Sequence, residues 1–203
     1  MISQIMGNVF SELWWMLLIL FGIGLLKAFK PYLKGKFGEF AVQAHVKLYL
    51  DERYILINDV TLPDEQGGTT QIDHIVLSPF GVFVVETKNY KGWIFGGERQ
   101  KMWTRKIDKQ SFKFKNTLHQ HYKHVKVLQR VLQDIVDVDY IHSAVVFMPE
   151  CEFKTAMPST VFKGKAWVDY IKTFNTEVIP VMKLKRIQLR IEKEVLEKSW
   201  KTN

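Results

Sequence analysis

The feature that most constrains this chain is an uncharged apolar stretch near its beginning. Residues 13–26 are fourteen positions without a charge, flanked by Glu12 and Lys27. Residues 9–26 contain eleven Leu, Ile, Phe and Val residues, together worth about −3 to −7 kcal/mol for insertion into a bilayer. We therefore expect one transmembrane helix that anchors the chain through residues 1–30. The alternative is an apolar helix packed on the domain or on a second copy.

The charges after this stretch predict its orientation. The lysines that follow it are Lys27, Lys30, Lys34 and Lys36. No cation precedes Lys27 and no Ala-x-Ala pattern follows the stretch, so a cleaved secretory signal is not expected. Lysines stay on the cytoplasmic side, which predicts a single-pass protein of the cell membrane with its main domain in the cytoplasm. Pro31 and Gly35 are residues that commonly interrupt helices, so we expect a short basic linker over residues 31–37.

Positive charge is concentrated in one part of the sequence. The chain has 203 residues, one cysteine and a net charge of +8, which fits about one domain in a reducing compartment with an anionic partner. Residues 88–130 carry twelve Lys and Arg against two acids, interleaved with aromatic residues. This composition favours nucleic acid as the partner. The cations expected to contact phosphates are Lys101, Arg105, Lys106 and Lys113. A solvated basic face, or one that binds anionic lipid, is the alternative.

Helical and strand patterns alternate after residue 37. Helices are expected over residues 38–50, 118–132 and 183–200, strands over 54–60, 70–77, 82–87 and 143–148, and a further hairpin from 93–95 and 102–105. The order helix, three strands, helix, strand is typical of the α/β class with a mixed sheet. We assign residues 38–150 to the core domain and residues 151–203 to a C-terminal strand and helix extension packed on it.

The first hairpin carries the candidate chemistry. If Ser78 and Gly81 close a tight turn, Asp73 faces Glu86 across the two strands. Two opposed carboxylates repel each other unless a cation offsets their charge, and Mg²⁺ or Mn²⁺ suits oxygen ligands. The alternative is a structural ion pair within the cluster.

Other polar side chains surround this acid pair in the sequence. Lys88 lies two residues beyond Glu86, so it could orient or deprotonate a water, or stabilise charge on a phosphate. His121 and His124 share a helical face, but with no acid near them in the segment we expect solvated or phosphate-facing rings. His74 is expected on the face opposite Asp73, as a packing residue.

Several segments resemble the nuclease-related domain (NERD) family, over roughly residues 36 to 132. The matching motifs are Gly38-Glu39-x-x-Val42, Thr70-Gln71-Ile72-Asp73-His74, Gly81 to Gly92 with Glu86-Thr87-Lys88-Asn89-Tyr90, and Trp103-Thr104. This family is similar to the PD-(D/E)xK nucleases, so the resemblance implies a restriction-endonuclease-like fold with an α-β-β-β-α-β core. The sequence departs from the pattern at Ile72 and at Asn116-Thr117, where proline is expected.

The resemblance also implies roles for individual residues. Asp73 and Glu86 would be metal ligands, Lys88 the catalytic lysine and Glu39 an auxiliary acid, and Gln71 and Gln120 would complete the site as polar members. The function predicted from the sequence is a membrane-anchored, divalent-metal-dependent nuclease that hydrolyses phosphodiester bonds in DNA. The alternative is a noncatalytic module that binds nucleic acid, or another partner, at the membrane surface.

Overall fold

The computed structural model describes residues 2–195, and the chain divides into two compact units, Met1–Phe37 and Gly38–Asn203. Helix α1 (Ile2–Tyr49) begins in the first unit and ends in the second. The structure differs here from the expected linker, because the helix continues through residues 31–37 without interruption. Proline inside a helix removes one backbone hydrogen bond, and a helix of 48 residues has many others.

The first unit exposes its apolar side chains. From Trp14 onward α1 is long and apolar enough, by length and composition, to cross a membrane. Its large side chains include Leu20, Phe21 and Leu26, which are 62%, 66% and 71% exposed. A continuous apolar surface of this kind is typical of contact with lipid or with another protein.

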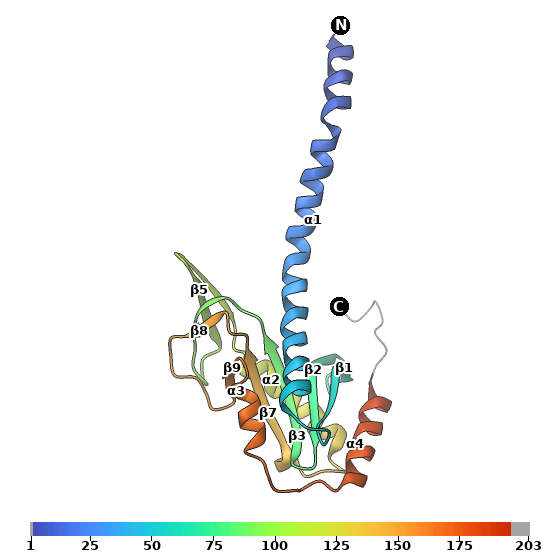
Figure 1. The fold of residues 1–203 in the computed structure, drawn as a ribbon, viewed down its shortest axis with the longest axis vertical. Coiled ribbons are helices and arrows are strands. Elements are labelled where there is room, and N and C mark those ends of the chain that lie inside the picture. The colour runs from blue at the N-terminus through green and yellow to red at the C-terminus, as the bar shows by residue number, and fades with distance from the viewer. Residues whose placement is uncertain (1, 196–203) are drawn as a thin grey trace. The chain divides into compact units, whose positions relative to one another are not determined.

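The second unit is built around a five-stranded mixed sheet with the order β1-β2-β3-β7-β9 (Figure 1). The strands are β1 (Ile55–Pro63), β2 (Thr69–Ser78), β3 (Gly81–Lys88), β7 (Ile141–Phe147) and β9 (Val161–Lys163). The first three strands are antiparallel, and β3, β7 and β9 are parallel. The predicted α/β class and the order α-β-β-β-α-β are confirmed by this arrangement.

Helices cover both faces of this sheet. On one face, α2 (Thr117–Leu132) and α4 (Val181–Glu194) pack through Leu128 and Ile187 against Val84. On the other, the end of α1 and α3 (Ala166–Lys172) pack through Val42 and Trp167 against Phe83. Because both faces are covered, β3 is a continuous apolar run rather than an alternating one. A short 3-10 helix, Val138–Tyr140, leads into β7.

A smaller four-stranded sheet, with the order β6-β5-β4-β8, lies beside the first. Its strands are β4 (Gly92–Phe95), β5 (Met102–Ile107), β6 (Gln110–Lys115) and β8 (Cys151–Phe153). The predicted hairpin of β4 and β5 is confirmed, whereas β6 and the separate sheet were not anticipated. Ile94 and Trp103 of this sheet pack with Phe147 of the larger one.

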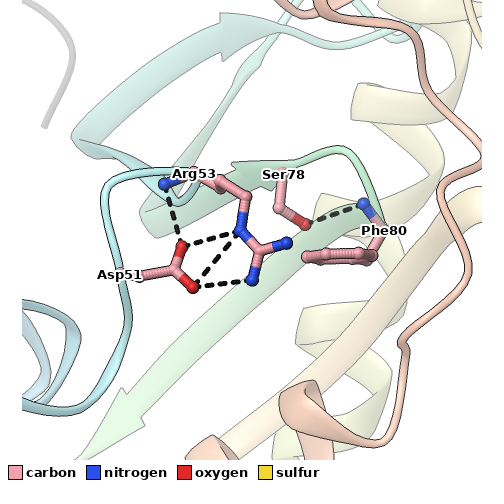
Figure 2. A network of polar contacts seen from close by, with 4 residues as sticks. All are labelled: Asp51, Arg53, Ser78 and Phe80. Atoms are coloured by element: carbon pink, nitrogen blue, oxygen red, sulfur yellow. Dashed lines mark hydrogen bonds and ion pairs between the residues drawn. The ribbon is translucent and has the colours of Figure 1, made fainter.

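The turn between β2 and β3 is stabilised by one of its own side chains and by residues that pack on it (Figure 2). Ser78 Oγ accepts a hydrogen bond from the Phe80 N–H at 3.2 Å, and the Arg53 guanidinium lies 4.8 Å from the centre of the Phe80 ring. Asp51 in turn pairs with Arg53 at 2.8 Å. Gly81 has a φ of 152°, and a Cβ there would lie 2.9 Å from the ring of His142. These contacts fix the turn, and with it the register of the hairpin.

The last predicted helix, over residues 183–200, is observed in part. Helix α4 buries Leu184, Ile187 and Ile191 in the core, as the sequence pattern predicts. It ends at Glu194 instead of continuing to Trp200. Trp200 itself lies outside the described residues.

Candidate active site

The β2–β3 hairpin brings the two candidate acids together. Ser78 lies opposite Gly81, and the ladder continues to His74 opposite Val85. Asp73 and Glu86 are the next residues of the two strands beyond this ladder, and the charge of Glu86 acts on Asp73. The predicted register of the hairpin is therefore confirmed.

Glu86 is buried, and other side chains approach both of its carboxylate oxygens. Only 3% of its side chain is exposed. The Lys88 ammonium donates to Oε1 at 2.5 Å, and His124 Nδ1 lies 3.2 Å from Oε2. Burial alone would raise the pKa of Glu86, but the approach of His124 and the charge of Lys88 outweigh burial and hold this pKa below its usual range. Glu86 is the ionised member of the acid pair.

Asp73 has the opposite character. Its Oδ2 accepts a hydrogen bond from the Thr87 N–H at 2.8 Å. Burial is the main cause that raises the pKa of Asp73 to about 7, and the charge of Glu86 adds to it. Two adjacent carboxylates, one buried and one partly buried, resist ionising together. The pair is therefore suited to hold one proton or one divalent cation.

Lys88 is charged at neutral pH. Burial opposes the ammonium form, since only 16% of the side chain is exposed, but Glu86 outweighs this and raises the pKa of Lys88. A protonated amine cannot accept a proton. Among the roles considered for Lys88, the geometry therefore favours orienting a water and stabilising negative charge over deprotonation.

Glu39 reaches the neighbourhood of the acid pair because α1 lies close to the end of β3. A Cβ at Gly38 would be 2.9 Å from Thr87 Cγ2 and 3.1 Å from Asn89 Cβ, so only glycine permits this approach. After burial and Glu86, the charge of Glu39 also contributes to the raised pKa of Asp73.

Asp59 is a residue of this region that the sequence did not reveal. It has a φ of 57°, a left-handed conformation that is strained for a residue with a Cβ. Its neighbours pair with His74 and Ile72, which places it opposite Asp73. The exposed side chain of Gln71 donates a hydrogen bond to the Asp59 carboxylate. The strained backbone beside Asp73 is the feature that singles out Asp59, and it can be seen only in the structure.

Gln120 and His74 are the remaining polar residues singled out from the sequence, and neither is shown to contact the acid pair in the described part of the chain. Gln120 is exposed on α2, and no polar contact described for residues 2–195 joins it to the acids. His74 is fully buried with its Nδ1 2.7 Å from Asn58 Oδ1, in agreement with a packing role.

The expectation for His121 and His124 was wrong. Both are buried on the face of α2 that packs on the sheet, with 1% and 3% exposure. The acid that the sequence segment lacked is Glu86, supplied by β3, and ligand atoms of all three residues lie within 4.8 Å of one another. A helical spacing of three residues signals a shared face but does not reveal which strand that face covers.

The candidate phosphate-binding cations lie on both faces of the smaller sheet or beside it. Arg105 lies 5.2 Å from the centre of the Tyr90 ring, two residues beyond Lys88 in the sequence. Lys106 is the next residue of β5, so it points to the opposite face, where it lies 5.6 Å from the Trp93 ring. Lys113 of β6 shares that face, and Lys101 precedes β5 as an exposed residue.

The fold is a mixed α/β domain, and its central hairpin carries two acids and a lysine. This combination agrees with the class of nuclease-related domains, which the sequence motifs resemble. The nuclease-related domain (NERD) family matches residues 34–148, and the chain belongs to this family. An uncharacterised protein of Bacillus anthracis is 40% identical over 130 residues, which cover 64% of this chain and 60% of that relative. No solved structure matches the chain.

A divalent cation, which membership of this family suggests, fits the residues present. Asp73 and Glu86 offer carboxylate oxygens, the donors that Mg²⁺ and Mn²⁺ prefer. The raised pKa of Asp73 indicates that Lys88 alone does not compensate two ionised acids. One added positive ion would remove this repulsion.

Proposed function

We propose that the chain is a membrane-anchored nuclease that uses Mg²⁺ or Mn²⁺ to hydrolyse phosphodiester bonds in DNA. The observation that supports this most is the meeting of Asp73, Glu86 and Lys88 on one hairpin of a nuclease-related domain. The proposed division is an anchor over residues 1–30, a basic connection over 31–37, the nuclease core over 38–150 and the extension over 151–203.

In this mechanism the chain's own residues bind, orient and offset charge. Asp73 and Glu86 would hold the cation, with Glu39 as an additional acid. The bound cation would supply positive charge at the phosphate and lower the pKa of a water. Lys88, as an ammonium, would stabilise the negative charge that develops on the phosphate oxygens.

The surrounding residues would position the DNA. Gln71 and Gln120 are exposed and would hydrogen bond to the backbone or to the attacking water. Lys101, Arg105, Lys106 and Lys113 would contact phosphates rather than bases, which gives affinity without sequence preference.

Plasmid cleavage by the full chain in detergent tests the catalytic proposal. With Mg²⁺ or Mn²⁺ we expect nicking or linearisation that EDTA stops. Asp73→Asn and Lys88→Met should each lower the rate by about 100-fold or more. Asp134→Asn is the matched control, because Asp134 is an acid paired with Arg190 at 2.8 Å on the surface. Equal cleavage by wild type and Asp73→Asn would contradict the proposed site, and DNA binding without cleavage would favour the noncatalytic module.

Membrane association is tested separately. The full chain should sediment with membranes and resist extraction by high salt. Leu20→Arg, within the apolar stretch, should weaken this by about 3 kcal/mol at the bilayer centre. Leu189→Arg is the control, because Leu189 is 57% exposed on α4. Complete release of the wild-type protein by salt would contradict a spanning anchor.

A further inference from the structure

Two buried histidines converge on Glu86 from the helix that covers β3. His121 and His124 are three residues apart on α2, so their rings leave the same face of the helix. Lys88 approaches Oε1 of Glu86, while His124 Nδ1 lies 3.2 Å from Oε2. The two oxygens of this carboxylate therefore face different chemical surroundings, a lysine at Oε1 and an imidazole at Oε2.

His121 has no partner that explains its position. Neither of its ring nitrogens makes a hydrogen bond with any residue in the described range 2–195. Burial is the main cause that lowers the pKa of His121 to about 4, and it outweighs the charge of Glu86 and the nearby Val84 carbonyl, which favour the protonated ring. The ring is therefore neutral, with a nitrogen lone pair available. Buried polar groups without a partner are uncommon, and each one calls for a reason such as a bound ion.

The spacing of the three donors suits a common metal ion. Metal–nitrogen and metal–oxygen bonds of about 2.0 to 2.2 Å place neighbouring ligand atoms roughly 3 to 3.5 Å apart. The separation of His124 Nδ1 and Glu86 Oε2, 3.2 Å, already falls in this range. One ligand atom from each of the three residues lies within 4.8 Å of the other two. Small side-chain rotations that move these atoms by about an ångström would bring all three to bonding distance from one ion.

The donor types select the class of ion. Imidazole nitrogens bind zinc and the transition metals, whereas Mg²⁺ prefers oxygen ligands and retains water. Two imidazoles with one carboxylate, the ligand set of several zinc and iron sites, leave further positions for water or substrate.

We propose that Glu86 Oε2, His121 and His124 form a binding site for zinc or a divalent transition metal, and that Glu86 joins this site to the oxygen-donor position beside Asp73. The shared role of Glu86 rests on the proposed function, whereas the histidine site itself does not. The competing arrangement is a buried proton between His124 and Glu86, with no metal. The two arrangements differ in metal affinity and in ligand-field absorption.

Cobalt(II) is the probe for this site. The full chain, purified in detergent without a histidine tag and stripped with EDTA, should bind one Co²⁺ and develop visible ligand-field bands. Zn²⁺ should remove these bands, and a large excess of Mg²⁺ should leave them. His121→Ala and His124→Ala should each abolish the bands and weaken Zn²⁺ binding in calorimetry by roughly 100-fold, about 2.7 kcal/mol.

Matched variants separate metal binding from folding. His119→Ala alters an exposed histidine of the same helix and should retain the wild-type bands. His121→Asn keeps a polar side chain of smaller size, and its circular dichroism and thermal unfolding report whether the domain is intact. Absent bands in an intact His121→Asn protein support the site.

Two results would overturn the inference: no Co²⁺ bands in wild type, or equal bands in wild type and in both alanine variants. The outcome is independent of cleavage. Histidine-dependent Co²⁺ binding in a chain that never cuts DNA would contradict the proposed function and leave the histidine site supported. If Co²⁺ bands are absent and the histidine variants leave Mg²⁺-dependent cleavage unchanged, the histidine site is refuted and the proposed function is supported.

Discussion

Two lysine–glutamate pairs in this molecule share their local geometry and differ in their surroundings. Lys88 pairs with Glu86 at the end of β3, and Lys154 pairs with Glu152 at the end of β8. Each pair joins residues two apart at 2.5 Å. The side chains of the first pair are 16% and 3% exposed, and those of the second are 32% and 56% exposed.

The difference shows that burial, rather than the distance between the charges, determines what an ion pair does. Water screens the Lys154–Glu152 pair and would solvate either partner alone. Neither Lys88 nor Glu86 can be removed without leaving the other charge in a low-dielectric interior. The same interior strengthens interactions with a bound cation or phosphate, so chemistry is expected at the first pair only.

The largest expected difference is in stability. Lys88→Met should lower the free energy of unfolding by about 3–5 kcal/mol, because Glu86 stays buried without its cation. Lys154→Met should leave the urea midpoint of the full chain close to the wild-type value. If both variants unfold at the same urea concentration, burial does not distinguish the two pairs.

A smaller effect is expected in the pH dependence of stability. The pKa of Asp73 is raised to about 7 in the folded chain, so the folded state holds this proton more tightly than the unfolded chain does. The stabilisation is complete below the ordinary aspartate pKa of about 4 and is lost as the pH rises through about 7. The melting temperature of Asp73→Asn relative to that of wild type should therefore rise between about pH 4 and pH 8. The corresponding free energy is about 1.4 kcal/mol for each unit by which the pKa of Asp73 is raised.

Metal and a surface acid provide the controls for this measurement. Saturating Mn²⁺ should erase the advantage of Asp73→Asn, because the cation offsets the charge of Asp73. Asp134 has a pKa lowered by its hydrogen bond with Arg190, so its stabilisation is present above pH 4 and is lost as the pH falls. Asp134→Asn should thus show no gain at neutral pH, and a gain equal to that of Asp73→Asn would refute the assignment.

The smallest expected effects lie on the exposed face of the smaller sheet. Lys106→Ala and Lys113→Ala should each weaken DNA binding a few-fold for every sequence. Each should also reduce the salt slope by about one ion. Lys172→Ala, an exposed lysine on α3, is the control. Binding of the wild-type chain to anionic liposomes, with no salt-dependent retention of DNA in a gel shift, would favour lipid as the partner of this face.

Short-range patterns predicted much of the fold and part of the site. The turn from Ser78 to Gly81 fixes a register, and alternation along two strands then brings Asp73 to Glu86. Strand β6 was not predicted because its two phenylalanines stand among lysines and polar residues, which reads as a solvated segment. Pro31 and Gly35 suggested a break that the long helix does not make.

The unpredicted part of the site depends on tertiary contacts. His121 and His124 were identified as sharing a face, yet their acid, Glu86, belongs to a strand far earlier in the chain. Asp59 gave no usable signal because aspartate, although enriched at left-handed φ, is also common in many other conformations, so one aspartate within a strand pattern does not identify that φ. Sequence patterns describe one element at a time, and these residues meet only where elements pack.

The parallel pairing of β3 with β7 has a consequence for the newly made chain. The hairpin with both acids leaves the ribosome well before α2 and β7, and Glu86 lies opposite Val145 only when β7 has docked. Non-local strand pairing of this kind forms late because its loop must close first. A nascent or truncated chain would hold the acids without the histidines or the enclosing strand. The proposed metal site would therefore be complete only in the finished domain.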